Sequence, residues 1–142
     1  MTMEAGTGTK QCQIIASDQD VVRVRQLVRA HAVAAKLSLV DQTKVVTAAS
    51  ELARNTLVHG GGGEAGIETI EDTDNGKRQG VRIVFTDDGP GIGDIELALT
   101  DGYTSGGGLG LGLGGARRLV DEFELDTAPG GGTTVSVTKW AR

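Results

Sequence analysis

Cysteine and aromatic residues are nearly absent from this sequence. One cysteine, Cys12, and two histidines occur in 142 residues, so the chain can form no internal disulfide and no Cys/His ligand cluster. This composition is typical of a protein of the reducing cytoplasm and argues against a Cys/His metal site. Aromatic side chains make up 3% of the chain. We therefore expect a core of Val, Leu, Ile and Ala, with Cys12 buried in it as a structural thiol.

The sequence also lacks an excess of positive charge and any long apolar run. Its formal net charge is −5, whereas proteins that bind nucleic acid present a clustered basic face. No apolar run reaches membrane-spanning length, and the N-terminus lacks the apolar segment of a signal peptide. We therefore expect neither nucleic acid nor a membrane among the partners.

What remains is the composition of one ordinary globular domain, since 142 residues can bury a core without disulfides or metals. Residues 1–10 are small and polar and predict a disordered tail, and 11–142 predict a single domain. Apolar periodicity and turn residues predict strands at 11–16, 66–72, 80–86, 124–128 and 133–140, and helices at 18–36, 41–59, 94–99 and 116–123. This order favours an α+β two-layer sandwich, in which a mixed, mostly antiparallel sheet is covered by helices on one face.

More than half of the residues in the stretch 101–115 are glycine. Glycine has no Cβ, so backbone N–H groups can close around an anion, and the helix predicted to follow adds its positive end. A flexible linker would carry more serine and polar residues, so we predict a phosphate-binding loop. Gly110, Gly112 and Gly115 also match the dinucleotide pattern G-x-G-x-x-G. No strand precedes them, which argues against a Rossmann site.

Polar side chains recur on one face of the second predicted helix. Glu51, Asn55 and His59 are spaced four residues apart and therefore project from the same side. Glu51 and Asn55 can supply a base and an oxygen ligand. We interpret His59 as the C-terminal cap of the helix, beside its dipole.

The roles of three arginines stay open at this level. Arg54 either approaches a phosphate or pairs with a nearby carboxylate. Arg117 and Arg118 are expected just inside the helix that follows the glycine loop, and the same two alternatives apply to them.

Four short motifs occur in an order that resembles the GHKL or Bergerat-fold ATPases and kinases. They are E-x-x-x-N at 51–55, D-x-G-x-G at 87–91, G-x-G-x-G at 108–112 and G-T-x-V at 132–135. Each motif is weak alone, but their order and spacing together are specific.

Within that family the sequence is most similar to the small bacterial switch serine/threonine kinases of stress-response partner switching, the RsbT type. The resemblance covers 11–142 and includes the segments SELARN, DGPGI and the terminal KWAR. It implies a kinase dependent on ATP and Mg²⁺ that phosphorylates a STAS-domain antagonist protein. The kinase is then free to engage another partner, such as a PP2C-type phosphatase.

The resemblance also implies roles for individual residues. Glu51 would be the catalytic base, Asn55 the Mg²⁺ ligand, and Asp87 the acceptor for the adenine amino group, while Asp88 would face solvent. Residues 101–107 would form a mobile lid. The residues that would bind the cofactor are Asn55, Asp87, Gly89, Gly91, Ile92, Gly106, Gly107, Gly108, Leu109, Gly110, Leu111, Gly112 and Thr133, with Thr134 as a less favoured neighbour.

Two other functions fit the same motifs. An anti-sigma factor of this fold would phosphorylate its antagonist and also sequester a sigma factor, and no ATP-site residue separates it from the switch kinase. A nucleotide-sensing module would bind ATP without transferring phosphate. Such a module would lack Glu51 or Asn55, and both are present here.

Overall fold

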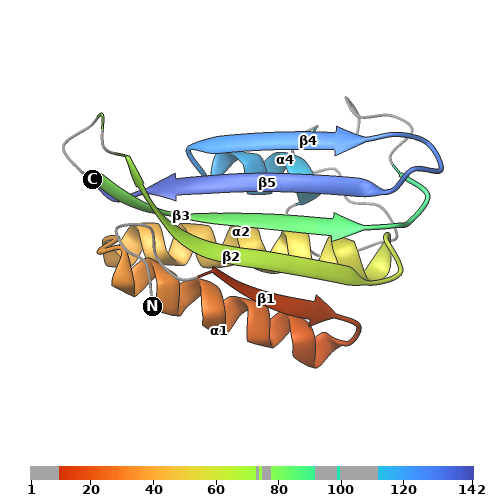
Figure 1. Ribbon diagram of the computed structural model, residues 1–142, viewed down its shortest axis with the longest axis horizontal. Helices are drawn as coiled ribbons and strands as arrows, with labels where there is room; N and C mark the ends of the chain where they lie inside the picture. Colours follow the sequence, from red (N-terminus) through yellow and green to blue (C-terminus); the bar gives the residue numbers. More distant parts are fainter. Residues whose placement is uncertain (1–9, 73, 75–77, 92–98, 100–111) are drawn as a thin grey trace.

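The computed structural model describes residues 10–72, 74, 78–91, 99 and 112–142. These residues form a five-stranded sheet with α1, α2 and α4 packed on one face (Figure 1). The elements in chain order are β1 (Lys10–Ile15), α1 (Asp18–Ala34), α2 (Leu39–Val58), β2 (Gly63–Asp72), β3 (Arg78–Asp87), α4 (Gly112–Arg118), β4 (Glu122–Thr127) and β5 (Thr133–Trp140). The predicted α+β two-layer sandwich is confirmed.

The strand order in the sheet is β1-β2-β3-β5-β4, and every neighbouring pair among the described strands is antiparallel. The last strand of the chain, β5, therefore lies between β3 and β4. This insertion places Thr133, the first residue of β5, opposite Asp87, the last residue of β3. Two of the sequence motifs thus meet at one end of the sheet, on the right in Figure 1.

The core lies between the sheet and the helices. On β3 the buried side chains alternate with exposed or half-buried ones, and Ile83 and Phe85 are almost fully enclosed. Helix α2 contributes buried Ala48, Ala49 and Leu52, and the small alanines let the helix approach the sheet closely. None of the described helices combines the length and the apolar composition needed to cross a membrane.

The starts of the two long helices follow from their capping residues. The Ser17 side chain accepts a hydrogen bond from the N–H of Asp20 and so caps α1. In α2 the cap is Ser38, whose hydroxyl accepts from the N–H of Asp41. The helix therefore begins at Leu39, two residues before the predicted start, and Asp41 lies buried in its first turn.

The prediction for the helix after the glycine loop was wrong by several residues at each end. Helix α4 spans Gly112–Arg118 instead of 116–123, because Leu113 and Ala116 bury their side chains in the core. Phe123 belongs to β4, where half-buried Phe123 and Leu125 alternate with exposed neighbours in the period-two pattern of a strand. Strands β2 and β3 are also longer than predicted. The hairpin tip 75–77 and most of the predicted helix 94–99 lie outside the described residues.

The expectation that Cys12 is buried was also wrong. Strand β1 is the edge strand of the sheet, and Cys12 is exposed on it. The helix-covered face of β1 carries Ile15, which is fully buried, whereas Ile14 is 61% exposed. In a strand, neighbouring side chains point to opposite faces, so Cys12 shares the open face with Ile14.

Candidate functional site

Four of the predicted site residues, Asp87, Gly89, Gly91 and Thr133, lie at or just beyond the end of β3 and the start of β5. Gly63, Asp87 and Thr133 are consecutive register partners across β2, β3 and β5. They continue the row of buried residues that includes Phe85 and Val135, so the Asp87 side chain lies on the helix-covered face. Asp87 therefore lies at the end of the core, where the sheet opens toward the C-terminus of α2.

The Asp87 carboxylate is held by the turn that follows it. Its Oδ1 accepts a hydrogen bond from the N–H of Gly89 at 2.8 Å. A Cβ on Gly60 would overlap the carboxylate, and a Cβ on Gly89 would lie 2.7 Å from the Gly60 Cα. Glycine at both positions lets the two turns close around Asp87. Within the described part of the chain, no group donates a hydrogen bond to Asp87 Oδ2, which leaves that oxygen available as an acceptor.

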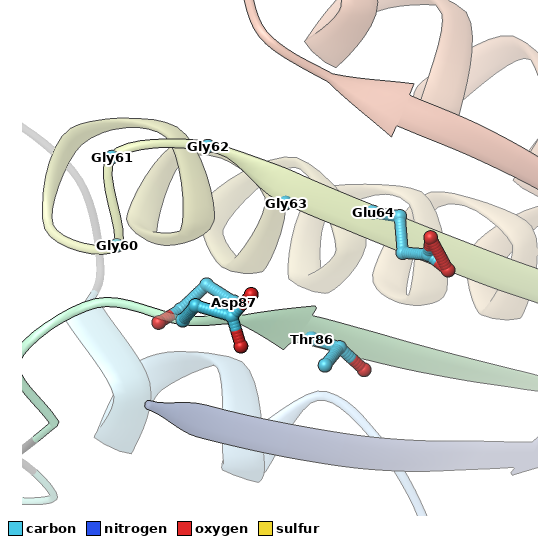
Figure 2. Close-up of a pocket in the computed structure, with 8 residues that line it drawn as sticks. Gly60, Gly61, Gly62, Gly63, Glu64, Thr86 and Asp87 are labelled. Atoms are coloured by element: carbon cyan, nitrogen blue, oxygen red, sulfur yellow. The ribbon is translucent and has the colours of Figure 1, made fainter. Parts of the chain in front are cut away.

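A hollow opens beside this carboxylate (Figure 2). Its volume is about 540 Å³, and it is lined by Gly60, Gly61, Gly62, Gly63, Glu64, Thr86, Asp87 and Asp88. This volume falls within the range of small-molecule sites. Because half of the lining residues are glycines, much of its wall is bare backbone with N–H and C=O groups. The side chain of Asp88 is exposed, as predicted.

Glu51 and Asn55 lie one turn apart on α2, and both are half-buried. Glu51 Oε1 accepts a hydrogen bond from the N–H of Gly112, the first residue of α4, at 3.4 Å. The Glu51 side chain therefore faces the point where the glycine loop leads into α4. The backbone carbonyl of Asn55 accepts hydrogen bonds from His59 at 2.9 Å and from Gly60 at 3.2 Å. These bonds end the helix and direct the chain to the glycine turn beside Asp87.

The turn 87–91 packs closely against the turn 128–132 of the β4–β5 hairpin, next to this site. The N–H of Gly130 donates to the carbonyl of Pro90 at 2.6 Å. A Cβ on Gly91 would overlap the carbonyl of Ala128, and a Cβ on Gly132 would overlap the carbonyl of Asp87. Both glycines also have positive φ, at 79° and 80°. The turn 87–91 therefore requires glycine for packing against the β4–β5 hairpin, a reason that the sequence did not suggest.

Thr133 is joined to a residue that sequence reasoning missed. Its Oγ1 lies 2.9 Å from Oγ1 of Thr127, the residue opposite it at the end of β4. A hairpin register centred on the turn 128–132 would have paired these two residues, so strand pairing was the signal that could have revealed Thr127. The two hydroxyls and the Asp87 carboxylate form one row across three strands.

Not every predicted residue belongs to this group. Arg117 and Arg118 occupy the last turn of α4, not its beginning, because the helix starts at Gly112. They therefore lie about 7.5 Å and about 9 Å along the helix axis from its first residue, so their expected position at the start of the helix was wrong. His59 is the C-cap of α2, as predicted. Arg54 is exposed on α2, and Thr134 lies on the face of β5 opposite to Thr133. Seven predicted residues lie outside the described part: Ile92, Gly106, Gly107, Gly108, Leu109, Gly110 and Leu111.

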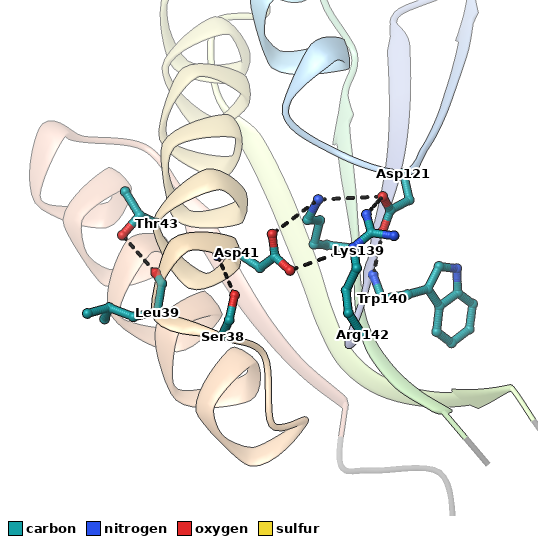
Figure 3. A network of polar contacts seen from close by, with 8 residues as sticks. All are labelled: Ser38, Leu39, Asp41, Thr43, Asp121, Lys139, Trp140 and Arg142. Atoms are coloured by element: carbon teal, nitrogen blue, oxygen red, sulfur yellow. Dashed lines mark hydrogen bonds and ion pairs between the residues drawn. The ribbon is translucent and has the colours of Figure 1, made fainter. Parts of the chain in front are cut away.

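Ion pairs join the first turn of α2 to the end of β5, far from the candidate site (Figure 3). The buried Lys139 ammonium group lies 3.6 Å from Asp41 in the first turn of α2 and 3.5 Å from Asp121, and Arg142 contacts both carboxylates. Burial opposes the ionisation of Asp121, but the N–H of Trp140 and the two cations outweigh it and hold the Asp121 pKa below its ordinary value. This network ties α2, which carries Glu51, to the end of β5 and so fixes how the two elements lie on each other.

Comparison with known proteins identified similar sequences and a similar fold. The family model described as histidine kinase-, DNA gyrase B-, and HSP90-like ATPase matches residues 40–141. The serine/threonine-protein kinase RsbT of Bacillus subtilis (strain 168) is 44% identical over 133 residues, which is 94% of this chain and 98% of that protein. An anti-sigma F factor of Thermoanaerobacter sp. (strain X514) is 28% identical over 137 residues, which is 94% of each chain.

A crystal structure of the RsbU and RsbW domains of a Mycobacterium tuberculosis protein has the same fold. It matches 94% of this chain with a TM-score of 0.63 and 21% sequence identity. This chain spans 33% of the length of that one. The region matched by the family model contains both Glu51 with Asn55 and Asp87 with Thr133.

Proposed function

Because this chain belongs to the histidine kinase-, DNA gyrase B-, and HSP90-like ATPase family, we propose that it is an ATP-dependent protein serine/threonine kinase that acts in partner switching. The relative that is 44% identical is a serine/threonine-protein kinase, and the match extends over 94% of this chain. The proposed substrate is a serine or threonine of a STAS-domain antagonist protein in the cytoplasm. Its phosphorylation would release the kinase to engage a PP2C-type phosphatase.

The observation that carries the proposal is that three of the motifs lie next to one another in the fold. Glu51 accepts a hydrogen bond from Gly112 at the start of α4, and the Asp87 turn packs on the glycine turn that directly follows the helix of Glu51 and Asn55. Asp87, whose Oδ2 receives no hydrogen bond within the described residues, lines a hollow of which half the lining residues are glycine. An acceptor oxygen and a backbone-lined cradle fit a purine base with an amino group, so the residues present suit ATP.

Each residue has a chemical task in this proposal. Bound Mg²⁺ and ATP would supply the transferable phosphoryl group and neutralise its charge. Asp87 would accept a hydrogen bond from the adenine amino group, and Asn55 would offer its side-chain oxygen to the hard Mg²⁺ ion. Glu51 would orient the substrate hydroxyl and take its proton. The hydrogen bond from Gly112 to Glu51 is long, at 3.4 Å, and can be given up at little cost.

The glycine loop would complete the site. Gly106, Gly107, Gly108, Leu109, Gly110, Leu111 and Gly112 would hold the β- and γ-phosphates through their N–H groups, and Ile92 would contact the base. Residues 101–107 would close over the nucleotide as a lid.

A second function is favoured by the anti-sigma F factors among the relatives, which are 28% to 35% identical to this chain over the matched residues. Such a protein would phosphorylate an antagonist and also sequester a sigma factor. Because the ATP site serves both functions equally, only the partners can separate them.

The deciding experiment combines purified protein, Mg-ATP and the STAS-domain proteins of the same organism. Intact-mass spectrometry measures the phosphate added to each candidate, with the Glu51→Gln variant as the control, and sigma factors are assayed in parallel for binding. Phosphate on a STAS protein without sigma binding is the expected result. Tight binding to a sigma factor would show that the protein acts as an anti-sigma factor and not as a switch kinase. ATP binding without transfer to any STAS protein and without sigma binding would leave a nucleotide-sensing module.

A further inference from the structure

We propose that Thr127 is a positioning residue of the nucleotide site, which makes the Thr133 hydroxyl a pure hydrogen-bond acceptor and so favours adenine over 6-oxopurines. This inference rests on the proposed function, since it requires a purine base beside Asp87. It assigns a selectivity role to a residue at the end of β4 that does not itself contact the base.

Strand register brings Thr127, Thr133 and Asp87 into one row. Thr127 is opposite Thr133 in the β4–β5 pair, and Thr133 is opposite Asp87 in the β3–β5 pair. Residues directly opposite each other in antiparallel strands project from the same face, with Cβ atoms about 5 Å apart. All three side chains are half-buried. Three oxygen-bearing groups therefore follow one another across the end of the sheet, and Asp87 among them lines the hollow.

Hydroxyl chemistry then fixes the direction of the hydrogen bonds. Thr127 Oγ1 lies 3.0 Å from the carbonyl oxygen of Gly132. A carbonyl only accepts and a threonine hydroxyl has one hydrogen, so Thr127 donates its hydrogen to Gly132. The contact of 2.9 Å between the two threonine hydroxyls must then be donated by Thr133. With its only hydrogen used, Thr133 can offer nothing but lone pairs to a ligand.

The consequence is a base-binding edge made of acceptors. An Asp87 carboxylate accepts hydrogen bonds, and so does Thr133 in this arrangement. The 6-amino group of adenine donates two hydrogens and matches them, directly or through a water. A 6-oxo group would face two acceptors and leave them unpaired, and a buried mismatch of this kind costs about tenfold or more in affinity.

The hairpin that carries Thr127 is anchored to the same turn. Gly130 donates to Pro90 at 2.6 Å, and Gly132 packs against the Asp87 carbonyl so closely that a Cβ there would overlap it. The carbonyl that receives the Thr127 hydrogen is therefore fixed relative to Asp87. Without the Thr127 hydroxyl, Thr133 regains its hydrogen, can rotate, and can donate to a 6-oxo group.

A purely structural Thr127 would behave differently. If it only closes the hairpin, its loss would weaken the binding of all purine nucleotides by the same factor. The ratio of two affinities therefore separates the two roles, and inosine triphosphate is the suitable probe because it carries an oxo group where ATP carries the amino group.

The test is isothermal titration calorimetry of Mg-ATP and Mg-inosine triphosphate with the full chain. Thr127→Val keeps the side-chain shape and removes the hydroxyl, so we expect the preference for ATP to fall about tenfold. Thr127→Ser keeps the hydroxyl and should restore the wild-type ratio. Ser136→Ala removes a hydroxyl from the opposite face of β5 and should leave the ratio unchanged.

Two outcomes would overturn the inference alone: an unchanged ratio in Thr127→Val, or a ratio that Thr127→Ser fails to restore. Wild-type protein that binds neither nucleotide would overturn the proposed function and this inference with it. Thermal melting checks that each variant is folded, and Thr127→Ala replaces the valine variant if valine is not accommodated. Since Thr127 is argued to act through Thr133, its substitution should not change the ratio further in a Thr133→Val background.

Discussion

Glu51 on α2 accepts a hydrogen bond from the backbone N–H of Gly112, the first residue of α4. The contact joins two motifs that are far apart in the sequence, the helix motif at 51–55 and the glycine motif that ends at Gly112. It places the proposed base where the chain returns from the glycine loop to the described structure. A base that takes a proton from a hydroxyl beside the γ-phosphate has to lie near that loop, so the contact supports the role proposed for Glu51.

Glu51→Gln should bind ATP normally and transfer phosphate about a hundredfold to ten-thousandfold more slowly, the usual loss for a general base. Glutamine retains a side-chain oxygen to accept the Gly112 hydrogen bond, so the local structure should persist. Single-turnover transfer to the STAS substrate measures the rate, and calorimetry measures nucleotide affinity. A variant as fast as wild type would remove Glu51 from the mechanism.

Asn55→Ala should lose the part of ATP affinity that depends on Mg²⁺, because the proposed oxygen ligand is deleted. Titrations with and without Mg²⁺ measure that part directly. Lys44→Ala, an exposed substitution near the other end of the same helix, is the matched control. Equal Mg²⁺ dependence in the Asn55 variant and wild type would exclude the metal-ligand role.

Asp87→Asn should weaken ATP binding relative to GTP. The substitution removes the charge from the acceptor oxygen while keeping its size, and hydrogen bonds to charged groups contribute enough to predict a loss of roughly tenfold to a hundredfold. Competition between the two nucleotides for a fluorescent analogue reports the ratio. If both nucleotides compete as they do with wild type, the adenine contact is wrong.

Gly132→Ala should destabilise the protein by about 3 kcal/mol or more, because it adds both a left-handed backbone conformation and an overlap with the Asp87 carbonyl. Gly130→Ala is the matched control, since its φ of 76° is similar but the space around its Cβ is open. It should cost only about 1–2 kcal/mol. Chemical denaturation gives both values. Equal losses would show that the two turns are not packed as the structure has them.

The Asp121 network predicts a dependence of stability on pH. The Asp121 pKa is lower in the folded chain than its ordinary value of 3.8, so the unfolded chain binds this proton more readily. The stabilisation from Asp121 is therefore complete above pH 3.8 and is lost as the pH falls below it.

Asp121→Asn should accordingly be less stable than wild type at pH 7, and the difference should shrink on acidification through the pKa range. Thermal melting between pH 7 and pH 3 measures it, with the exposed carboxylate Asp126→Asn as the control. A difference that stays constant with pH would show that the network acts only through packing.

Sequence alone was sufficient where the cause is local. Thr133–Trp140 is a strand with the predicted bounds, because period-two alternation depends on neighbouring residues. The motifs at 51–55 and 87–91 likewise predicted the family correctly, since each motif is a short run whose chemistry is carried by the residues themselves.

Only the tertiary structure decided which distant residues meet. The pairing of Thr127 with Thr133, the burial of Asp41 against Lys139 and the exposure of Cys12 all depend on strand order and register. Helix α4 begins at Gly112 despite its glycines because Leu113 and Ala116 find a core to pack into. A local pattern does not contain these contacts, because they arise only when segments far apart in the chain are brought together by burial of their apolar faces.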